Sequence, residues 1–181
     1  MSSIKELIGT ISFKTKHNIE ISAYVEFDNN YPEDIIFFSF FENMNRSDPL
    51  SMKLTINDVL IMVETIRANI KGSQNGKPDF EVFKKETKNP SSGKFSNLYI
   101  TAATIEKKDQ SLIQYYINIS KDTKKGAITM SSNGIMVFCQ RVERLMVLLE
   151  NGLYQAQKNI YNKKAKEKAH IEPYEEGEKD E

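Results

Sequence analysis

The stretch "KKGAITMSSNGIMVF", from Lys124 to Phe138, predicts a short strand that leads directly into a helix. Apolar and polar residues alternate through "GAITM", and from Ile135 onward apolar residues recur at helical spacing. Ser131 or Ser132 can cap this helix, because a side-chain hydroxyl accepts a hydrogen bond from the first helical turn. The stretch "LSMKLTINDVLIM", which begins at Leu50, makes the same step. We therefore expect one strand-to-helix unit to occur twice.

Three further candidate strands precede each of these units. Residues 11–27 alternate apolar and polar with a break at "KHN", which indicates a hairpin, and "IIFFSFFEN" is a strand that is apolar on both faces. In the second half, "DFEVFKKE", "KFSNLYITAATIEK" and "SLIQYYINIS" are the corresponding strands. The segments "NNYPED", "NRSDP" and "NPSSG" are expected loops. We expect the second helix to bend at Asn151-Gly152 and to resume through Tyr161.

The two halves align at a shift of 76 residues. Capping and apolar positions from Met52 to Ile70 match those from Ile128 to Met146, and in the third strands Phe37 falls on Ile113. The alignment predicts an α+β fold made of tandem β-β-β-β-α repeats, with antiparallel sheets and helices packed on one face; a chance coincidence of apolar periodicity is the alternative. The expected parts of one compact domain are 1–72 (first unit), 73–78 (linker), 79–169 (second unit with an extended helix) and 170–181 (acidic disordered tail).

Composition excludes several classes of protein. Of the 181 residues, 39% are apolar and 28% are charged, which is ordinary for a globular chain. No apolar run approaches the ~18–20 residues of a membrane span, and the N-terminus lacks the apolar region of a signal peptide. We expect Cys139 to be a small buried hydrophobe in a reducing, cytoplasmic compartment, which would be the bacterial host cytoplasm for a viral protein.

Sequence motifs of the common enzyme classes are missing. The chain has no phosphate-binding loop, no paired-cysteine zinc spacing and no nucleophile elbow, and neither His17 nor His170 lies in a Cys/His motif. We therefore expect a protein that is not an enzyme and that uses no cofactor and no metal.

Charge is distributed unevenly, although the formal net charge is zero. The last ten residues, "EPYEEGEKDE", hold six acidic side chains, and the remaining chain has 24 basic and 19 acidic ones. A basic body with an acidic end is a weak indication of nucleic-acid binding. The expected docking tail consists of Glu172, Tyr174, Glu175, Glu176, Glu178, Asp180 and Glu181.

Strand alternation assigns aromatic and basic side chains to the outer faces of the two sheets. Aromatic rings offer stacking surfaces for bases of any sequence, and lysines bind phosphates. In the first unit we also expect Phe38 and Phe40 on the outer face, with core positions as the alternative, since strands favour aromatics anyway. Lysines at strand ends can equally be ordinary solvated edges. The predicted nucleic-acid-binding residues are Lys14, Lys16, Tyr24, Lys53, Lys84, Lys85, Lys88, Lys94, Tyr99, Lys107, Lys108, Tyr116, Lys124 and Lys125.

The stretch from Lys124 to Phe138 resembles the end of the transcriptional coactivator positive cofactor four, whose β-β-β-β-α unit binds single-stranded DNA. The wider Whirly-type fold, which includes plant Whirly proteins and kinetoplastid mitochondrial RNA-binding proteins, places two such units in a chain of about this length. The resemblance implies a binding role for Lys124 and Lys125. The first unit has "LSMKLTIND" without a Lys-Lys-Gly, so whether it binds nucleic acid or only packs stays open.

These features together predict a sequence-tolerant single-stranded DNA-binding protein of replication, recombination or repair. The acidic tail is similar in kind to those through which bacterial and viral single-strand binding proteins recruit replication enzymes. Richness in Lys, Asn and Ile is typical of AT-rich genomes, those of bacteriophages among them. RNA binding or transcriptional regulation on the same fold is one alternative. A structural or assembly protein with an aromatic subunit interface is another. We expect no membrane partner, and a homo-oligomer is compatible with either hypothesis.

Overall fold

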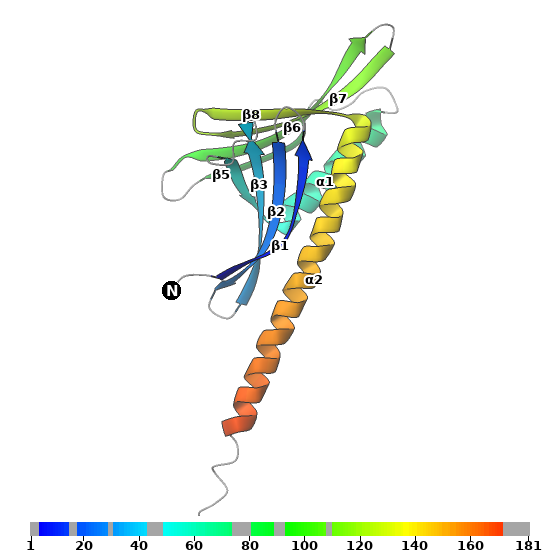
Figure 1. The fold of residues 1–181 in the computed structure, drawn as a ribbon. Coiled ribbons are helices and arrows are strands. Elements are labelled where there is room, and N and C mark those ends of the chain that lie inside the picture. Colours follow the sequence, from blue (N-terminus) through cyan, green and yellow to red (C-terminus); the bar gives the residue numbers. More distant parts are fainter. Residues whose placement is uncertain are drawn as a thin grey trace, which may run out of the picture.

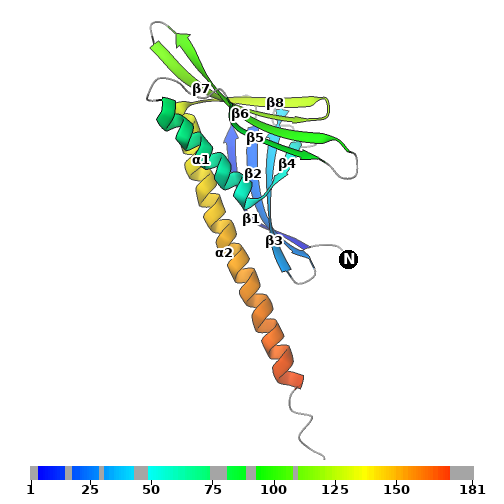
Figure 2. The ribbon, with the colours of Figure 1, turned by 180° about the vertical axis from the view of Figure 1, so that it is seen from behind.

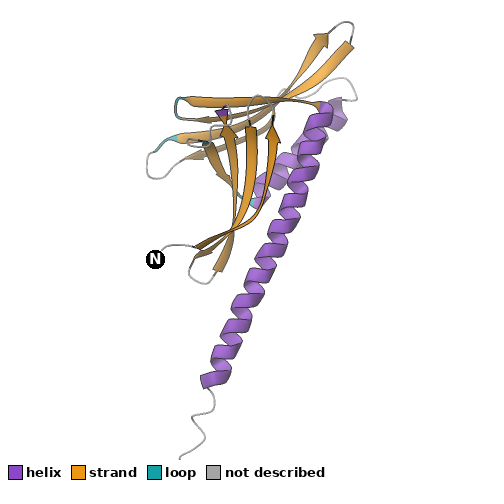
Figure 3. Cartoon of the chain, viewed as in Figure 1, coloured by secondary structure: helices purple, strands orange, loops and turns teal. Residues whose placement is uncertain are grey.

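The computed structural model describes residues 4–14, 18–28, 31–42, 49–73, 81–88, 93–107 and 110–171. Two four-stranded antiparallel sheets and two helices make an α+β fold, as the sequence predicts (Figures 1 and 3). The sheet orders are β1-β2-β3-β4 and β5-β6-β7-β8, and one helix follows each sheet. The elements are β1 (Ile4–Lys14), β2 (Asn18–Asp28), β3 (Tyr31–Phe41), β4 (Leu50–Leu54), α1 (Ile56–Ser73), β5 (Glu81–Lys88), β6 (Phe95–Lys107), β7 (Gln110–Lys121), β8 (Lys124–Ser131) and α2 (Ser132–Ile171).

Each sheet turns one apolar face to a shared core. In β2, for example, Ile19, Ile21, Ala23 and Val25 are buried, because alternate strand residues point to the same side. A single apolar cluster contains residues of both sheets and both helices. Both sheets and both helices therefore contribute side chains to one core.

The sheets also contact each other directly. Gly126 in β8 lies against the Phe40 ring of β3, and a Cβ built on Gly126 would come within 2.2 Å of Phe40 Cδ1. This close approach explains the glycine of "KKGAITM". Between the units, Tyr115 in β7 donates a buried hydrogen bond of 3.0 Å to Asn69 Oδ1 in α1.

Helix α2 packs along the first sheet as well as beside its own. Its Phe138 ring lies 5.0 Å from the Phe13 ring of β1, measured between centroids. Helix α1 packs between α2 and the second sheet (Figure 2). We expected α2 to bend at Gly152, but the helix is unbroken there. A Cβ at Gly152 would lie 2.8 Å from Ile8 Cδ1, so the glycine lets β1 approach the helix closely.

Two expectations about the faces of β3 were wrong. Phe38 and Phe40 are buried in the core, whereas Phe37 is half-buried on the outer face. Phe38 pairs with Met52, and Ile117 pairs with Ile128, so Phe38 corresponds to Ile117 rather than to the residue 76 positions along. The connection between β3 and β4 is longer than that between β7 and β8, which changes the shift. A slip of an odd number of residues exchanges the two faces of a strand.

Element boundaries differ modestly from the expected ones. The strand β3 begins at Tyr31 and so includes most of the expected loop "NNYPED", and β1 begins at Ile4, before the predicted hairpin. The predicted linker, 73–78, begins one residue too early, since Ser73 belongs to α1. Residues 74–80 and the acidic tail, 172–181, lie outside the described residues.

Candidate nucleic-acid interface

The outer face of the second sheet carries a continuous set of aromatic, amide and basic side chains. Strand pairing places Lys84, Tyr99, Asn118 and Ala127 side by side in one row across β5, β6, β7 and β8. The next row consists of Glu86, Asn97, Ser120 and Lys125. Both helices lie on the opposite side of this sheet (Figures 1 and 2).

Lysines on β5 lie next to aromatic rings. Lys84 Nζ lies 5.3 Å from the ring centroid of Tyr99, and Lys88 Nζ lies 5.8 Å from that of Phe95. Contact with the Tyr99 hydroxyl, and then the nearby carboxylates Glu81 and Glu86, raise the pKa of Lys84. The ammonium of Lys84 therefore stays charged beside a ring on which a base can stack.

An open hollow of about 400 Å³ lies on this outer face. The hollow exists because Ser120, Gly126 and Ala127 have small side chains or none. Tyr99 and Lys125 border it. Asn118 Nδ2 donates a 3.3 Å hydrogen bond to the Tyr116 carbonyl oxygen. The residues lining the hollow are Asn97, Tyr99, Asn118, Ile119, Ser120, Lys125, Gly126 and Ala127.

The turn between β7 and β8 positions the lysine pair of "KKGAITM". Asp122 has a φ of 55°, a left-handed conformation that aspartate tolerates in turns. The Asp122 carboxylate also forms an ion pair with Lys94, in which Oδ2 lies 3.4 Å from Nζ. This ion pair joins the start of β6 to the turn. After the turn, Lys125 lies on the outer face with Ser120, and Lys124 belongs to the opposite side of the strand.

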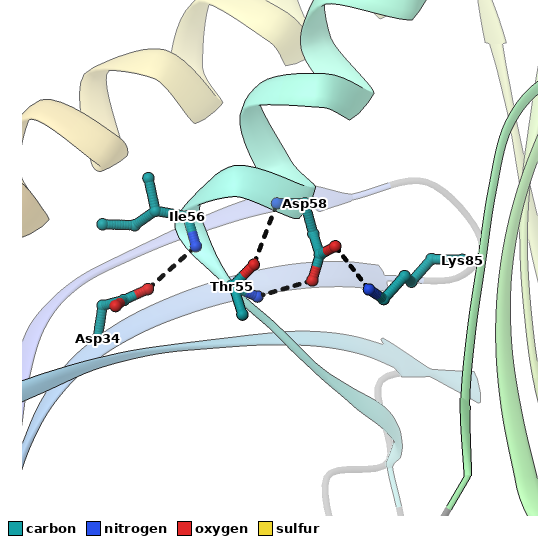
Figure 4. A network of polar contacts seen from close by, with 5 residues as sticks. All are labelled: Asp34, Thr55, Ile56, Asp58 and Lys85. Carbon is teal, nitrogen blue, oxygen red and sulfur yellow. Dashed lines mark hydrogen bonds and ion pairs between the residues drawn. The ribbon is translucent and has the colours of Figure 1, made fainter.

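Lys85 does not belong to this surface. It alternates with Lys84 and points to the other side, where Nζ donates to Asp58 Oδ1 at 2.6 Å (Figure 4). Thr55 and Asp58 also cap α1: Thr55 N donates to Asp58 Oδ2 at 3.1 Å, and Asp58 N donates to Thr55 Oγ1 at 3.2 Å. Thr55 is therefore the N-terminal cap of α1. Ile56 N donates to Asp34 at 3.0 Å, so β3 also anchors this helix end.

The Asp58 carboxyl is held in its charged form. Burial alone would raise its pKa, but the hydrogen bond from Lys85, together with those from Thr55, lowers it below the ordinary value of 3.8. Lys85 thus joins the second sheet to the first helix, and no local sequence pattern indicates this partner.

The first sheet presents a different outer face. Its row equivalent to Lys84, Tyr99, Asn118 and Ala127 consists of Ser12, Glu20, Ser39 and Ser51, and Ser39 and Ser51 share a 2.8 Å hydrogen bond. Tyr24 packs edge-on against Phe37, with centroids 5.8 Å apart. The exposed Lys53 pairs with Phe37 across the strands. The predicted residues Tyr24 and Lys53 therefore lie together, but apart from those of the second sheet.

The structure describes only part of the remaining predicted set. Lys14 and Lys107 lie at strand ends in β1 and β6, and their side chains are outside the description. Lys16, Lys108 and all seven residues of the predicted docking tail lie outside the described residues.

Sequence reasoning missed Phe95 and Asn97 as members of the outer face. Alternation from Tyr99 in the same strand could have found both, since residues two apart share a face. Phe95 is 46% exposed, so its ring is accessible at the surface.

Other kinds of site find little support in the described part of the chain. Its His, Cys, Asp and Glu residues form no group that could hold a metal ion, and neither helix there is long and apolar enough to cross a membrane. Cys139 is buried as predicted, and burial raises the pKa of its thiol to about 12, which disfavours the reactive thiolate.

No protein-family model matches the chain, and no curated protein does.

Proposed function

We propose that this chain binds single-stranded DNA with little dependence on sequence, through the outer face of the β5–β8 sheet. One observation carries the proposal: Lys84, Tyr99 and Asn118 form a row in which Nζ of Lys84 lies 5.3 Å from the tyrosine ring centroid. A ring beside a fixed positive charge matches a nucleotide, because the base stacks while the lysine meets the phosphate.

Neighbouring residues extend this surface in both directions along the sheet. Lys88 with Phe95 repeats the pairing of ammonium and ring, and Lys125 adds charge at the β8 edge. Tyr116 lies on the same face, and its hydroxyl donates to Gln114 Oε1 at 3.2 Å, which holds the ring in place. Glu81 and Glu86 lie on β5 among the lysines, so the binding surface is only moderately positive.

Two features disfavour the rival hypothesis of an aromatic subunit interface. It relied on Phe38 and Phe40 at the surface together with Tyr99 and Tyr116, and both phenylalanines are in the core. The remaining rings alternate with amides and lysines, whereas the cores of subunit interfaces are depleted of charge.

The test is a titration of a labelled dT oligonucleotide at several salt concentrations. We expect binding at low salt, with log affinity falling by ~0.7 per phosphate contact for each log unit of salt. The triple variant Lys84→Gln, Lys88→Gln, Lys125→Gln should bind weakly and with a shallower slope. The triple variant Lys71→Gln, Lys158→Gln, Lys163→Gln, at three lysines exposed on the helices, is the matched control. No binding at low salt would refute the proposal.

Replication, recombination or repair is the proposed setting, with residues 172–181 as a docking segment for partner proteins. A segment with six carboxylates can also compete with DNA for the lysines. Ending the chain after Ile171 should then tighten DNA binding, and unchanged or weaker binding would contradict the competition. Parallel titrations with matched RNA decide between DNA and RNA, because only RNA offers the 2′-hydroxyl.

A further inference from the structure

The hollow on the second sheet holds two side-chain amides whose hydrogen bonding is incomplete. Asn97 Oδ1 is buried and has no hydrogen-bond partner among the described residues. Buried polar atoms are nearly always paired, so an unpaired one calls for an explanation. Oδ1 is closed to solvent, but Asn97 lines the hollow, so a rotation of its amide toward a ligand that brings a donor would supply the missing partner.

The second amide is oriented by the backbone. Asn118 Nδ2 donates to the carbonyl oxygen of Tyr116, and this bond fixes which end of the amide is engaged. Oδ1 of Asn118 is then the end left to accept from a ligand. Asn118 pairs with Tyr99, and Asn97 lies two residues before Tyr99, so both amides lie beside the ring proposed to stack a base.

We propose that this hollow receives one base of the bound strand and prefers guanine, an inference that rests on the proposed function. Two amide oxygens require hydrogen-bond donors, and guanine carries donors on two adjacent atoms of its pairing edge, N1–H and the 2-amino group. Adenine and cytosine each place their donor next to an acceptor. Thymine flanks its one donor with two carbonyl oxygens, which would repel the amide oxygens.

The dimensions and floor of the hollow fit a single base. About 400 Å³ is within the range of roughly 300–1,000 Å³ that is typical of small-ligand sites. Ala127 pairs with Asn118, and its side chain is only a methyl group, so it leaves room in the hollow. The Phe40 ring packs against Gly126 on the inner side of the sheet. Lys125, in the next row, is placed to meet the phosphate of the same nucleotide.

The experiment compares three short strands: all-dT, the same strand with one central guanine, and the same strand with inosine, which lacks only the 2-amino group. We expect the guanine strand to bind about five-fold or more tightly than all-dT, and inosine to lose most of that gain. Asn97→Ala and Asn118→Ala should each remove the preference, so that the variant binds the guanine strand no more tightly than all-dT. Asn151→Ala, exposed on α2, should leave the preference intact.

A further variant and a competition with free nucleotide separate the possible outcomes. Asn97→Asp retains the accepting oxygen, so the ratio of guanine to all-dT affinity should survive even where the added charge weakens both. Equal affinity of the wild type for the three strands, with dT binding intact, would overturn the guanine preference and leave the proposed function standing. No binding to any strand would overturn both. Displacement of the strand by free dGMP as readily as by oligonucleotide would identify a free nucleotide as the occupant and refute a strand site.

Discussion

The outer faces of the two sheets share their strand order but differ in their side chains. In equivalent rows, the second sheet has Tyr99 between a lysine and an asparagine, and the first has Glu20 between two serines. A carboxylate repels phosphate, and Ser39 and Ser51 already bond to each other. The two sheets therefore share a strand order but not the side chains of the proposed binding surface, and we infer that the first sheet mainly supports the second.

The inner faces, in contrast, are equivalent in role. Both are apolar and both enter one core, in which Phe40 of the first sheet fills the space left by Gly126 of the second. Packing of the core uses both inner faces, whereas the proposed strand binding uses only one outer face.

The largest effect is expected at the contact between the sheets. Phe40→Ala should lower the free energy of unfolding by ~3–5 kcal/mol, because it empties a buried site. Denaturant unfolding measures this change. Phe37→Ala on the outer face is the control, and we expect a clearly smaller loss there. Equal losses would mean that the faces of β3 are not as different as their burial indicates.

A second comparison contrasts the two tyrosines. Tyr99→Ala should weaken binding to dT by ~1–3 kcal/mol through lost stacking, while Tyr24→Ala, whose ring packs against Phe37, should leave binding unchanged. Anisotropy titration measures both variants, with thermal unfolding to show that each is folded. A larger effect at Tyr24 would reverse the roles of the two sheets.

Removal of the Asp58–Lys85 ion pair between the units should have a moderate effect on the free energy of unfolding. Asp58→Asn removes the charge paired with Lys85 and should cost about 1 kcal/mol, since both side chains are partly exposed. Folding lowers the Asp58 pKa, so its contribution is present above the unfolded value near 3.8 and is lost as the pH falls through the lower folded value. The difference between variant and wild type should therefore shrink in acid. A difference that persists there would assign the effect to something other than charge.

The smallest effect on the free energy of unfolding is expected for a substitution at Asn97. Asn97→Ala removes an unpaired buried oxygen and should change the unfolding free energy little or raise it. Asn69→Ala is the contrasting variant, because it leaves the buried Tyr115 hydroxyl without its acceptor and should cost ~1–3 kcal/mol. A large loss at Asn97 would show that its oxygen has a structural partner.

Much of this architecture could be predicted from periodicity. The strand-to-helix units aligned correctly: Met52 and Ile128 are both buried, and Thr55 and Ser131 both cap their helices. These segments have one apolar face, which fixes their register.

The predicted alignment of the third strands, β3 and β7, was wrong for a physical reason. Residues 35–41 are apolar on both faces, so alternation could not tell Phe37 from Phe38, and the different connection lengths hid the true equivalence. At the candidate site, the outer position of Tyr99 followed from alternation, whereas Lys84 was predicted only as one of the lysines at strand ends. The pairing of Lys85 with Asp58 depends on how the two units pack and leaves no local pattern.

Photocrosslinking with a bromodeoxyuridine strand tests most directly which sheet binds. Crosslinked peptides, identified by mass spectrometry, should contain Tyr99 and Tyr116 of the second sheet, and the lysine triple variant should lose them. Crosslinks at Tyr24 and Phe37 of the first sheet, with none at Tyr99, would contradict the assignment of binding to the second sheet.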